Sequence, residues 1–266
     1  MSFRDAARCG AFVALTVTLM QPVRAALGPI QWIYGQGTKW SRVGEVRTYA
    51  RVAADGEVVE VGFELPMDAI KSPPAMMGPG PAGSQQPLDW PSIVRQQTWF
   101  NHLEIHWNPN GHEPAIFMVP HFDFHFYHMP EAEVWGIQGI DPLPPDSAHL
   151  PAGYIYPGPA AGVPQMGVHT FNPAEITPPF RAVMIAGFWD GQMNFVEPMI
   201  TRERLLTRQS FTLPVPRPAF IDATNRFPTT MRAVYQPRLN TYYIGFADFV
   251  TIPGRGYDVG DTVAAR

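Results

Sequence analysis

The chain has 266 residues, a formal net charge of −4 and no cluster of lysine or arginine. This charge argues against a nucleic-acid partner, because proteins that bind polyanions usually present a basic patch. The 30 prolines and 23 glycines leave little room for long helices, because proline interrupts the hydrogen bonds of helices and of central strands.

The first 25 residues have the pattern of a secretory signal peptide. Arg4 and Arg8 precede an uncharged run at 9–20, and small residues around Ala25 suit cleavage there. The run is shorter than the roughly 20 residues of a transmembrane helix. We therefore expect an exported protein, periplasmic or extracellular, whose mature chain of residues 26–266 has no membrane span. That chain would keep 16 basic and 22 acidic residues and no cysteine.

The first predicted elements form a hairpin. Segments 46–53 and 58–65 alternate apolar and polar residues on either side of Asp55-Gly56, a dipeptide typical of tight β-turns. Segment 72–87, rich in proline and glycine, follows it. We interpret this segment as a surface loop within one domain, because neither flank looks able to fold alone.

Two further strands are predicted where six of the eight histidines lie, between His102 and His128. Period-two geometry in segment 99–108 places these side chains on one face: His102, Glu104, His106 and Asn108. In segment 119–127 the same geometry groups these: His121, Asp123, His125 and Tyr127. Bulky apolar residues fill both opposite faces. The connection is short enough for the strands to pair antiparallel or to lie in adjacent sheets.

The rest of the chain continues the β pattern. A second hairpin is predicted from 181–189 and 192–197 around Asp190-Gly191, and a last strand covers 241–250. Short helices are predicted at two places, 130–140 and 201–207, and a second long loop at 141–164. The predicted fold class is all-β, a mainly antiparallel barrel or sandwich with a few short helices, forming a single domain over 26–266.

The histidine-rich segment predicts a metal site. Strand neighbours at i and i+2 lie about 6.5–7 Å apart, so Asp123 and His125 can converge on one ion, whereas His121 and His125 do so only if the strand bends. Other ligands would come from elsewhere in the chain. We predict a divalent ion, zinc, manganese or iron, bound by these residues: His112, His121, Asp123, His125 and His169. In an enzyme the ion would polarise a substrate or activate water, assisted by Tyr127 or Glu197.

The alternative is a solvated sheet face or a hydrogen-bonded polar network, because the wet side of an antiparallel sheet also alternates. Glu197 is then a strand-end acid bonded to backbone, and His128 and His149 are surface residues. On this interpretation the protein is a non-catalytic envelope protein, which binds a small apolar ligand inside the barrel or forms an oligomeric structural assembly. Whether the chain is an enzyme stays open at this point.

Several blocks resemble those of a known family. They are WNPNGHEP (107–114), VPHFDFHFY (119–127), MGVHT (166–170) and FVEPMIT (195–201). They are similar to the blocks of secreted bacterial β-proteins of unknown function, one of which, from a thermophile, forms a ring-like homodecamer. Thr170 stands where that family usually has tryptophan, and His106 is not a fixed feature of its pattern. The resemblance implies a β fold and a homo-oligomer, and it implies no activity.

Overall fold

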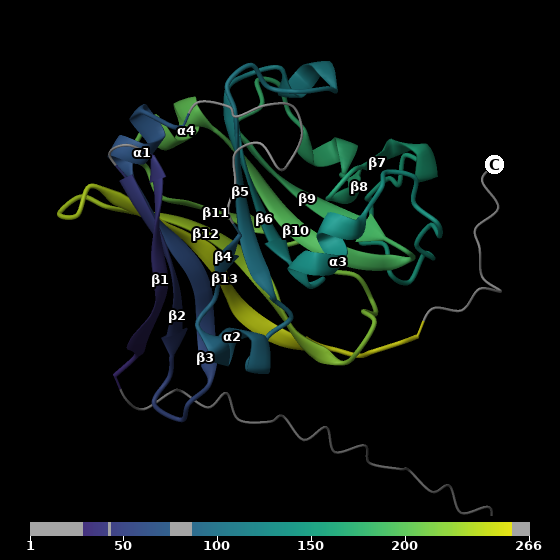
Figure 1. Cartoon of the computed structure of the whole chain (residues 1–266), viewed down its shortest axis with the longest axis horizontal. Coiled ribbons are helices and arrows are strands. Elements are labelled where there is room, and N and C mark those ends of the chain that lie inside the picture. Colours follow the sequence, from purple (N-terminus) through teal and green to yellow (C-terminus); the bar gives the residue numbers. More distant parts are fainter. Residues whose placement is uncertain (1–28, 42–43, 75–86, 257–266) are drawn as a thin grey trace, which may run out of the picture.

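The computed structural model describes residues 29–41, 44–74 and 87–256 (Figure 1). The expected signal peptide and most of the predicted 72–87 loop lie outside these residues. The described chain forms two sheets, and the strands within each pair antiparallel. The predicted all-β class is confirmed.

The two sheets differ in the parts of the chain that build them. The six-stranded sheet contains, in spatial order, β1 (Gln31–Ser41), β2 (Gly44–Val52), β3 (Val58–Pro66), β13 (Thr241–Ile252), β12 (Asn225–Gln236) and β11 (Phe211–Pro214). The seven-stranded sheet contains β4 (Leu88–Asp89), β5 (His102–Asn108), β6 (His121–Tyr127), β10 (Gln192–Thr201), β9 (Ala182–Trp189), β8 (Gly167–Thr170) and β7 (Gly162–Val163). Chain ends therefore make the first sheet, and the middle of the chain makes the second (Figure 1).

Both predicted hairpins are confirmed. β2 pairs with β3 across the Asp55-Gly56 turn, and β9 pairs with β10 across Asp190-Gly191. In the second turn both central residues have positive φ, +51° at Asp190 and +78° at Gly191. This backbone matches the right-handed twist of the flanking strands, which explains why the Asp-Gly dipeptide predicted the turn correctly.

The helices are few and short. The described residues contain α1 (Met67–Lys71), α2 (Ser92–Gln97), α3 (Glu131–Gly136) and α4 (Arg202–Leu206), with 3-10 turns η2 (Ala115–Phe117), η3 (Pro159–Ala161) and η4 (Pro173–Glu175). The helix predicted at 130–140 is shorter than expected, because it stops at Gly136, a residue of low helix propensity. No helix in the described ranges is long and apolar enough to cross a membrane.

The main core lies between the two sheets. Phe122, Phe124 and Phe126 of β6 all point into it and are fully buried. Ring centroids lie 5.0 Å apart for Phe63 and Phe124 and 4.5 Å apart for Phe126 and Phe246, so aromatic rings from both sheets fill this space. The burial of these rings supplies much of the favourable free energy of folding.

A second apolar cluster covers the opposite face of the seven-stranded sheet. Its members are Phe117, Tyr127, Val134, Phe180, Val183, Ile185, Phe195 and Met199. Three of them lie outside the strands: Phe117 in η2, Val134 in α3 and Phe180 in the segment before β9. The polar face of β5 and β6 lies on this side, so it is enclosed. The alternative of a solvated sheet face is therefore wrong.

Candidate metal centre

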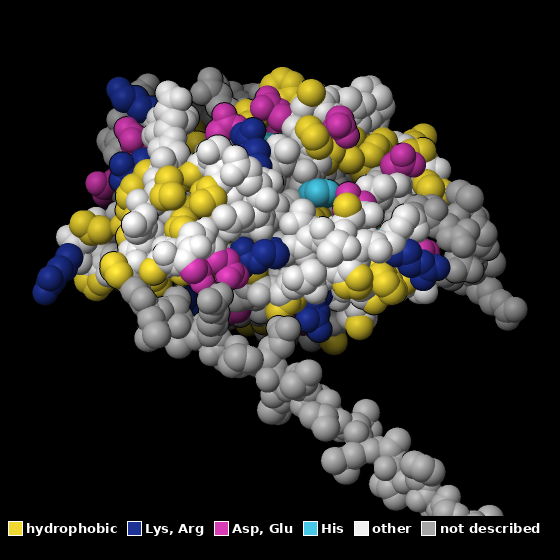
Figure 2. All heavy atoms as spheres, turned by 90° about the horizontal axis from the view of Figure 1, so that it is seen from below, with side chains coloured by type: hydrophobic (Ala, Val, Ile, Leu, Met, Phe, Trp, Pro, Cys, Tyr) yellow, Lys and Arg dark blue, Asp and Glu magenta, His cyan; other side chains and the backbone are white. Residues whose placement is uncertain are grey.

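The pairing of β5 with β6 gathers the polar residues on one face. The cross-strand partners are His102 with Tyr127, Glu104 with His125, His106 with Asp123, and Asn108 with His121. All of these except Asn108 are buried. The molecular face in Figure 2 accordingly shows histidine in only one small area. Burial of this many imidazoles and carboxylates requires that they satisfy one another or share a cation.

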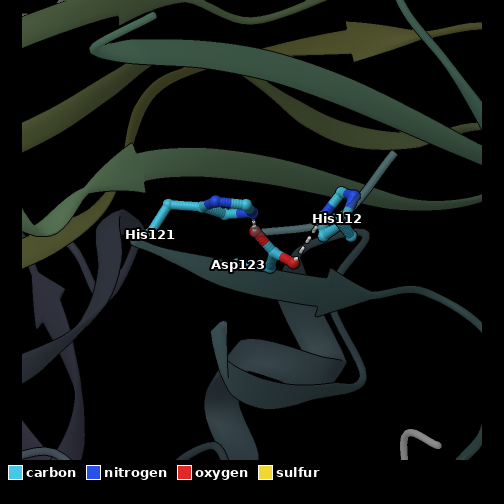
Figure 3. A group of neighbouring side chains, drawn as sticks. All are labelled: His112, His121 and Asp123. Carbon is cyan, nitrogen blue, oxygen red and sulfur yellow. Dashed lines mark ion pairs between the residues drawn. The ribbon is translucent and has the colours of Figure 1, made fainter. Parts of the chain in front are cut away.

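One group of three residues surrounds the carboxylate of Asp123. His121 and His112 face it from two sides, each directed at a different oxygen (Figure 3). Nε2 of His121 lies 3.1 Å from Oδ1, and Nε2 of His112 lies 3.3 Å from Oδ2. The side chain of His121 is 0% exposed, that of Asp123 8%, and that of His112 41%. Ligands on one tetrahedral zinc ion lie about 3.4 Å apart, so these atoms have the spacing of a metal site.

Backbone carbonyls fix the tautomer of both histidines. Nδ1 of His121 lies 2.7 Å from the carbonyl oxygen of Val119, and Nδ1 of His112 lies 2.8 Å from that of Glu113. A carbonyl can only accept, so each Nδ1 carries the proton and donates it. In the neutral ring this leaves a lone pair on each Nε2, and both lone pairs are directed at Asp123. This is the usual outer-shell arrangement of metal-binding histidines.

Asp123 is held as an anion. Asn108 Nδ2 donates to its Oδ2 at 2.6 Å, which orients the carboxylate. Burial by itself raises the pKa of Asp123, but His112 and His121 outweigh it and hold that pKa well below its usual range. Burial likewise lowers the pKa of His112, and the Asp123 carboxylate reverses this and raises it. A proton or a metal ion between the three groups satisfies the same electrostatic demand.

A second group of three lies farther along the same face. Nε2 of His125 and Nε2 of His169 are both 3.6 Å from Oε2 of Glu197. The side chains of His125 and Glu197 are 0% and 1% exposed, and that of His169 is 26% exposed. A separation of 3.6 Å is too long for a hydrogen bond. Neither ring nitrogen of His125 nor Oε2 of Glu197 has a hydrogen bond among the described residues.

Burial dominates the electrostatics of this second group. It lowers the pKa of His125 well below the usual value, helped by the neighbouring His106 and His169, and it lowers the pKa of His169 to about 4. It also raises the pKa of Glu197 well above its usual range, with the negative charge of Asp123 adding to the effect. At neutral pH burial therefore favours the uncharged form of both imidazoles and of the Glu197 carboxyl group.

A third buried acid, Glu104, lies between two histidines. Its carboxylate oxygens lie 3.3 Å from His106 and 3.7 Å from His102. Burial raises the pKa of Glu104, but the two neighbouring histidines outweigh this effect and lower that pKa to about 2. The ring of Tyr127 stacks on His102 at a centroid distance of 4.7 Å, and burial keeps the Tyr127 pKa well above its usual value. Tyr127 is therefore a phenol inside the polar layer.

The five predicted ligands fall into two groups rather than one. Asp123 lies with His121 and His112, whereas His125 lies with His169. His121 and His125 are in different groups, in keeping with the distance argument from the sequence. The spacing in the sequence favours a pairing of Asp123 with His125, at i+2, but in the structure Asp123 contacts His121, at i−2. Both positions lie on the same face of β6, and the loop that carries His112 reaches Asp123 near His121.

Three expectations from the sequence need correction. Glu197 is not a strand-end acid, because it lies inside β10 and faces two imidazoles. His149 is not at the surface: it is buried, and its Nδ1 lies 2.8 Å from Asp146. His128 is half-buried and pairs with Asp222 at 3.1 Å. Each also contacts a residue far along the chain, His128 through Asp222 and His149 through the carbonyl oxygen of Arg255, and no local pattern reveals such contacts.

Glu197 and His169 reach the site through long-range strand order. β10 lies beside β6, and β8 lies beyond β9, so the two residues converge on His125 only once four strands are assembled. The available sequence signal was the alternation of β10, in which Phe195, Glu197 and Met199 share one face. No family model, no curated protein and no solved structure matches this chain, so the resemblance to the secreted bacterial β-proteins stays a prediction and the function is argued from this geometry.

Proposed function

We propose that the protein binds a divalent transition-metal ion through His112, His121 and Asp123. The observation that carries the proposal is the pair of imidazoles whose Nδ1 protons are donated to backbone carbonyls and whose Nε2 atoms converge on one buried carboxylate. Two acceptors directed at a third acceptor repel one another unless a cation lies between them. The fixed tautomers favour a metal ion in that place.

The ligand set indicates the class of ion. Two imidazoles and one carboxylate suit zinc, iron or manganese, whereas calcium and magnesium prefer oxygen ligands throughout. Three protein ligands leave a coordination position free, as in catalytic zinc sites. Because the side chain of His112 is 41% exposed, water or a substrate could reach an ion beside it and be polarised there.

The competing proposal is a polar network that holds protons in place of a metal ion. It would make the protein a non-catalytic envelope component, in line with the export and the homo-oligomer that we also propose from the sequence. The raised pKa of His112 is compatible with this reading, because it favours the protonated ring beside Asp123. Metal content separates the two proposals directly.

The test compares the wild-type chain with Asp123→Asn, which keeps the shape of the side chain and removes its charge. Each protein is incubated with zinc, manganese or iron, freed of unbound ion by gel filtration and examined by elemental analysis. We expect Asp123→Asn to hold about one ion per chain less than the wild type. His128→Gln changes a half-buried histidine outside both groups and serves as the control, with wild-type content expected.

Two outcomes would overturn the proposal. One is wild-type protein holding less than about 0.1 ion per chain with every metal, since a preformed three-ligand site should retain at least one of them. The other is Asp123→Asn with the full metal content of the wild type. Circular dichroism of each variant shows whether a lost ion reflects a lost ligand or a lost fold.

A further inference from the structure

We infer that His125, His169 and Glu197 form a second binding site for a divalent transition-metal ion, separate from the first. The three ligand atoms come from β6, β8 and β10 and lie within 4.8 Å of one another. The inference goes beyond the proposed function, because it concerns other residues and does not require the first site to be filled.

The unsatisfied atoms of this group point to a ligand. Oε2 of Glu197 and both ring nitrogens of His125 are buried and form no hydrogen bond with the described residues. Buried polar atoms without partners are unusual in folded proteins, because each carries an unrelieved desolvation penalty. Two of these atoms, Oε2 of Glu197 and Nε2 of His125, lie 3.6 Å apart, so a single bound ion would satisfy both.

The charge balance also points to a cation. Among the described residues no lysine or arginine forms an ion pair with Glu197, and its only ionic contacts are with His125 and His169. The Glu197 carboxyl group therefore lies in a buried position with no permanently charged cationic side chain beside it in the described part of the chain. An ion carrying two positive charges would stabilise the carboxylate and accept both lone pairs. Two nitrogens and one oxygen select the same class of metal as the first site.

Gly187 of β9 explains how His169 reaches the group. β9 separates β8 from β10, and Gly187 lies in register between His169 on one side and Phe195 on the other. A Cβ atom at Gly187 would overlap the Phe195 ring. With no side chain there, His169 and Phe195 approach to a centroid distance of 5.0 Å, and Phe195 lies 4.8 Å from His125. Phe195 thus forms an apolar wall shared by both imidazoles.

The two sites are neighbours on one strand. Asp123 of the first and His125 of the second are adjacent on the polar face of β6, about 6.5–7 Å apart along the strand. His106 lies beside His125 at a centroid distance of 4.7 Å and pairs with Glu104, so it fills the space toward β5. The two proposed ion sites therefore lie side by side, the first partly exposed at His112 and the second partly exposed at His169.

The experiment uses one alanine variant per site. His112→Ala and His169→Ala are matched, because both remove a partly exposed imidazole and leave the buried members in place. Zinc is measured by elemental analysis, and cobalt(II) is titrated while its visible absorption is recorded. We expect about two ions in the wild type, about one in each variant and almost none in the double variant.

The outcomes distinguish the two sites. If His169→Ala keeps the full metal content while His112→Ala loses an ion, the second site is overturned and the first stands. If His169→Ala loses an ion and His112→Ala does not, the first is overturned and the second stands. A wild-type chain that holds only one ion, and loses it in either variant, would show one shared site and overturn the inference. Glu197→Gln, which is nearly isosteric, repeats the test should His169→Ala fail to fold.

Discussion

At the scale of single residues, the second nitrogen of each imidazole decides what that histidine can do. His121 donates Nδ1 to a backbone carbonyl and keeps Nε2 for a ligand. In His149, Nδ1 faces Asp146 at 2.8 Å and Nε2 faces the carbonyl oxygen of Arg255 at 3.0 Å. His121 thus directs one ring nitrogen at Asp123, where we propose a metal ion, whereas both ring nitrogens of His149 contact acceptor groups of the chain. Amino-acid type alone does not distinguish these two roles, because both residues are histidines.

The Asp146 contact predicts a pH-dependent stability. Burial raises the pKa of Asp146, but hydrogen bonds from His149 outweigh it and lower that pKa. A carboxyl whose folded pKa is depressed stabilises the fold above its unfolded pKa of about 3.9, and this stabilisation is lost as the pH falls through the folded value. We expect Asp146→Asn to lower the free energy of unfolding by about 1–2 kcal/mol at pH 7.

Urea unfolding at several pH values tests this expectation. The difference between wild type and Asp146→Asn should narrow steadily below about pH 4, because the wild-type carboxyl is then protonated as well. A difference that stays constant down to pH 2 would show that the charge on Asp146 contributes nothing and that only the shape of the side chain counts.

At the scale of elements, the alternation of β6 could be predicted and its surroundings could not. Strand period is a local property, so the split between Phe124 on one face and Asp123 on the other followed from the sequence. The burial of the polar face depends on Phe117, Val134 and Phe180, which lie outside the strands in a 3-10 turn, a short helix and a loop. The grouping of His169 with Glu197 depends on strand order, which is set by contacts far apart in the chain.

Gly187 of β9 tests whether packing across neighbouring strands positions the second group of residues. Gly187→Ala would force the Phe195 ring to move, because the added Cβ overlaps it, and Phe195 packs on both His125 and His169. We expect the variant to lose the ion of the second site and to keep that of the first, as measured by zinc content per folded chain. Gly136→Ala is the control, because a Cβ there meets no atom within 4 Å. Loss of the same ion in the control would contradict the role assigned to Gly187.

At the scale of the whole molecule, the two faces of the seven-stranded sheet differ: one packs into the main core and the other carries the two histidine groups. One face contributes Phe122, Phe124 and Phe126 to the core between the sheets, and the other face carries the histidines under a second apolar cluster. The proposed ligands come from three strands of this sheet and one loop. An ion bound to them would hold the sheet together, and its binding would be linked to folding.

This linkage predicts a metal-dependent melting temperature. An ion that binds only the folded chain adds about 2.7 kcal/mol to the free energy of unfolding when its free concentration is one hundred times Kd, which for a chain of this size raises Tm by about 5–10 °C. We expect a rise of this order for each filled site, reversed by a chelator and reduced in turn by His112→Ala and His169→Ala. His128→Gln should keep the whole rise, even if its Tm without metal is lower. A Tm that zinc, manganese and iron leave unchanged in the wild type would mean that these buried histidines are held by protons alone.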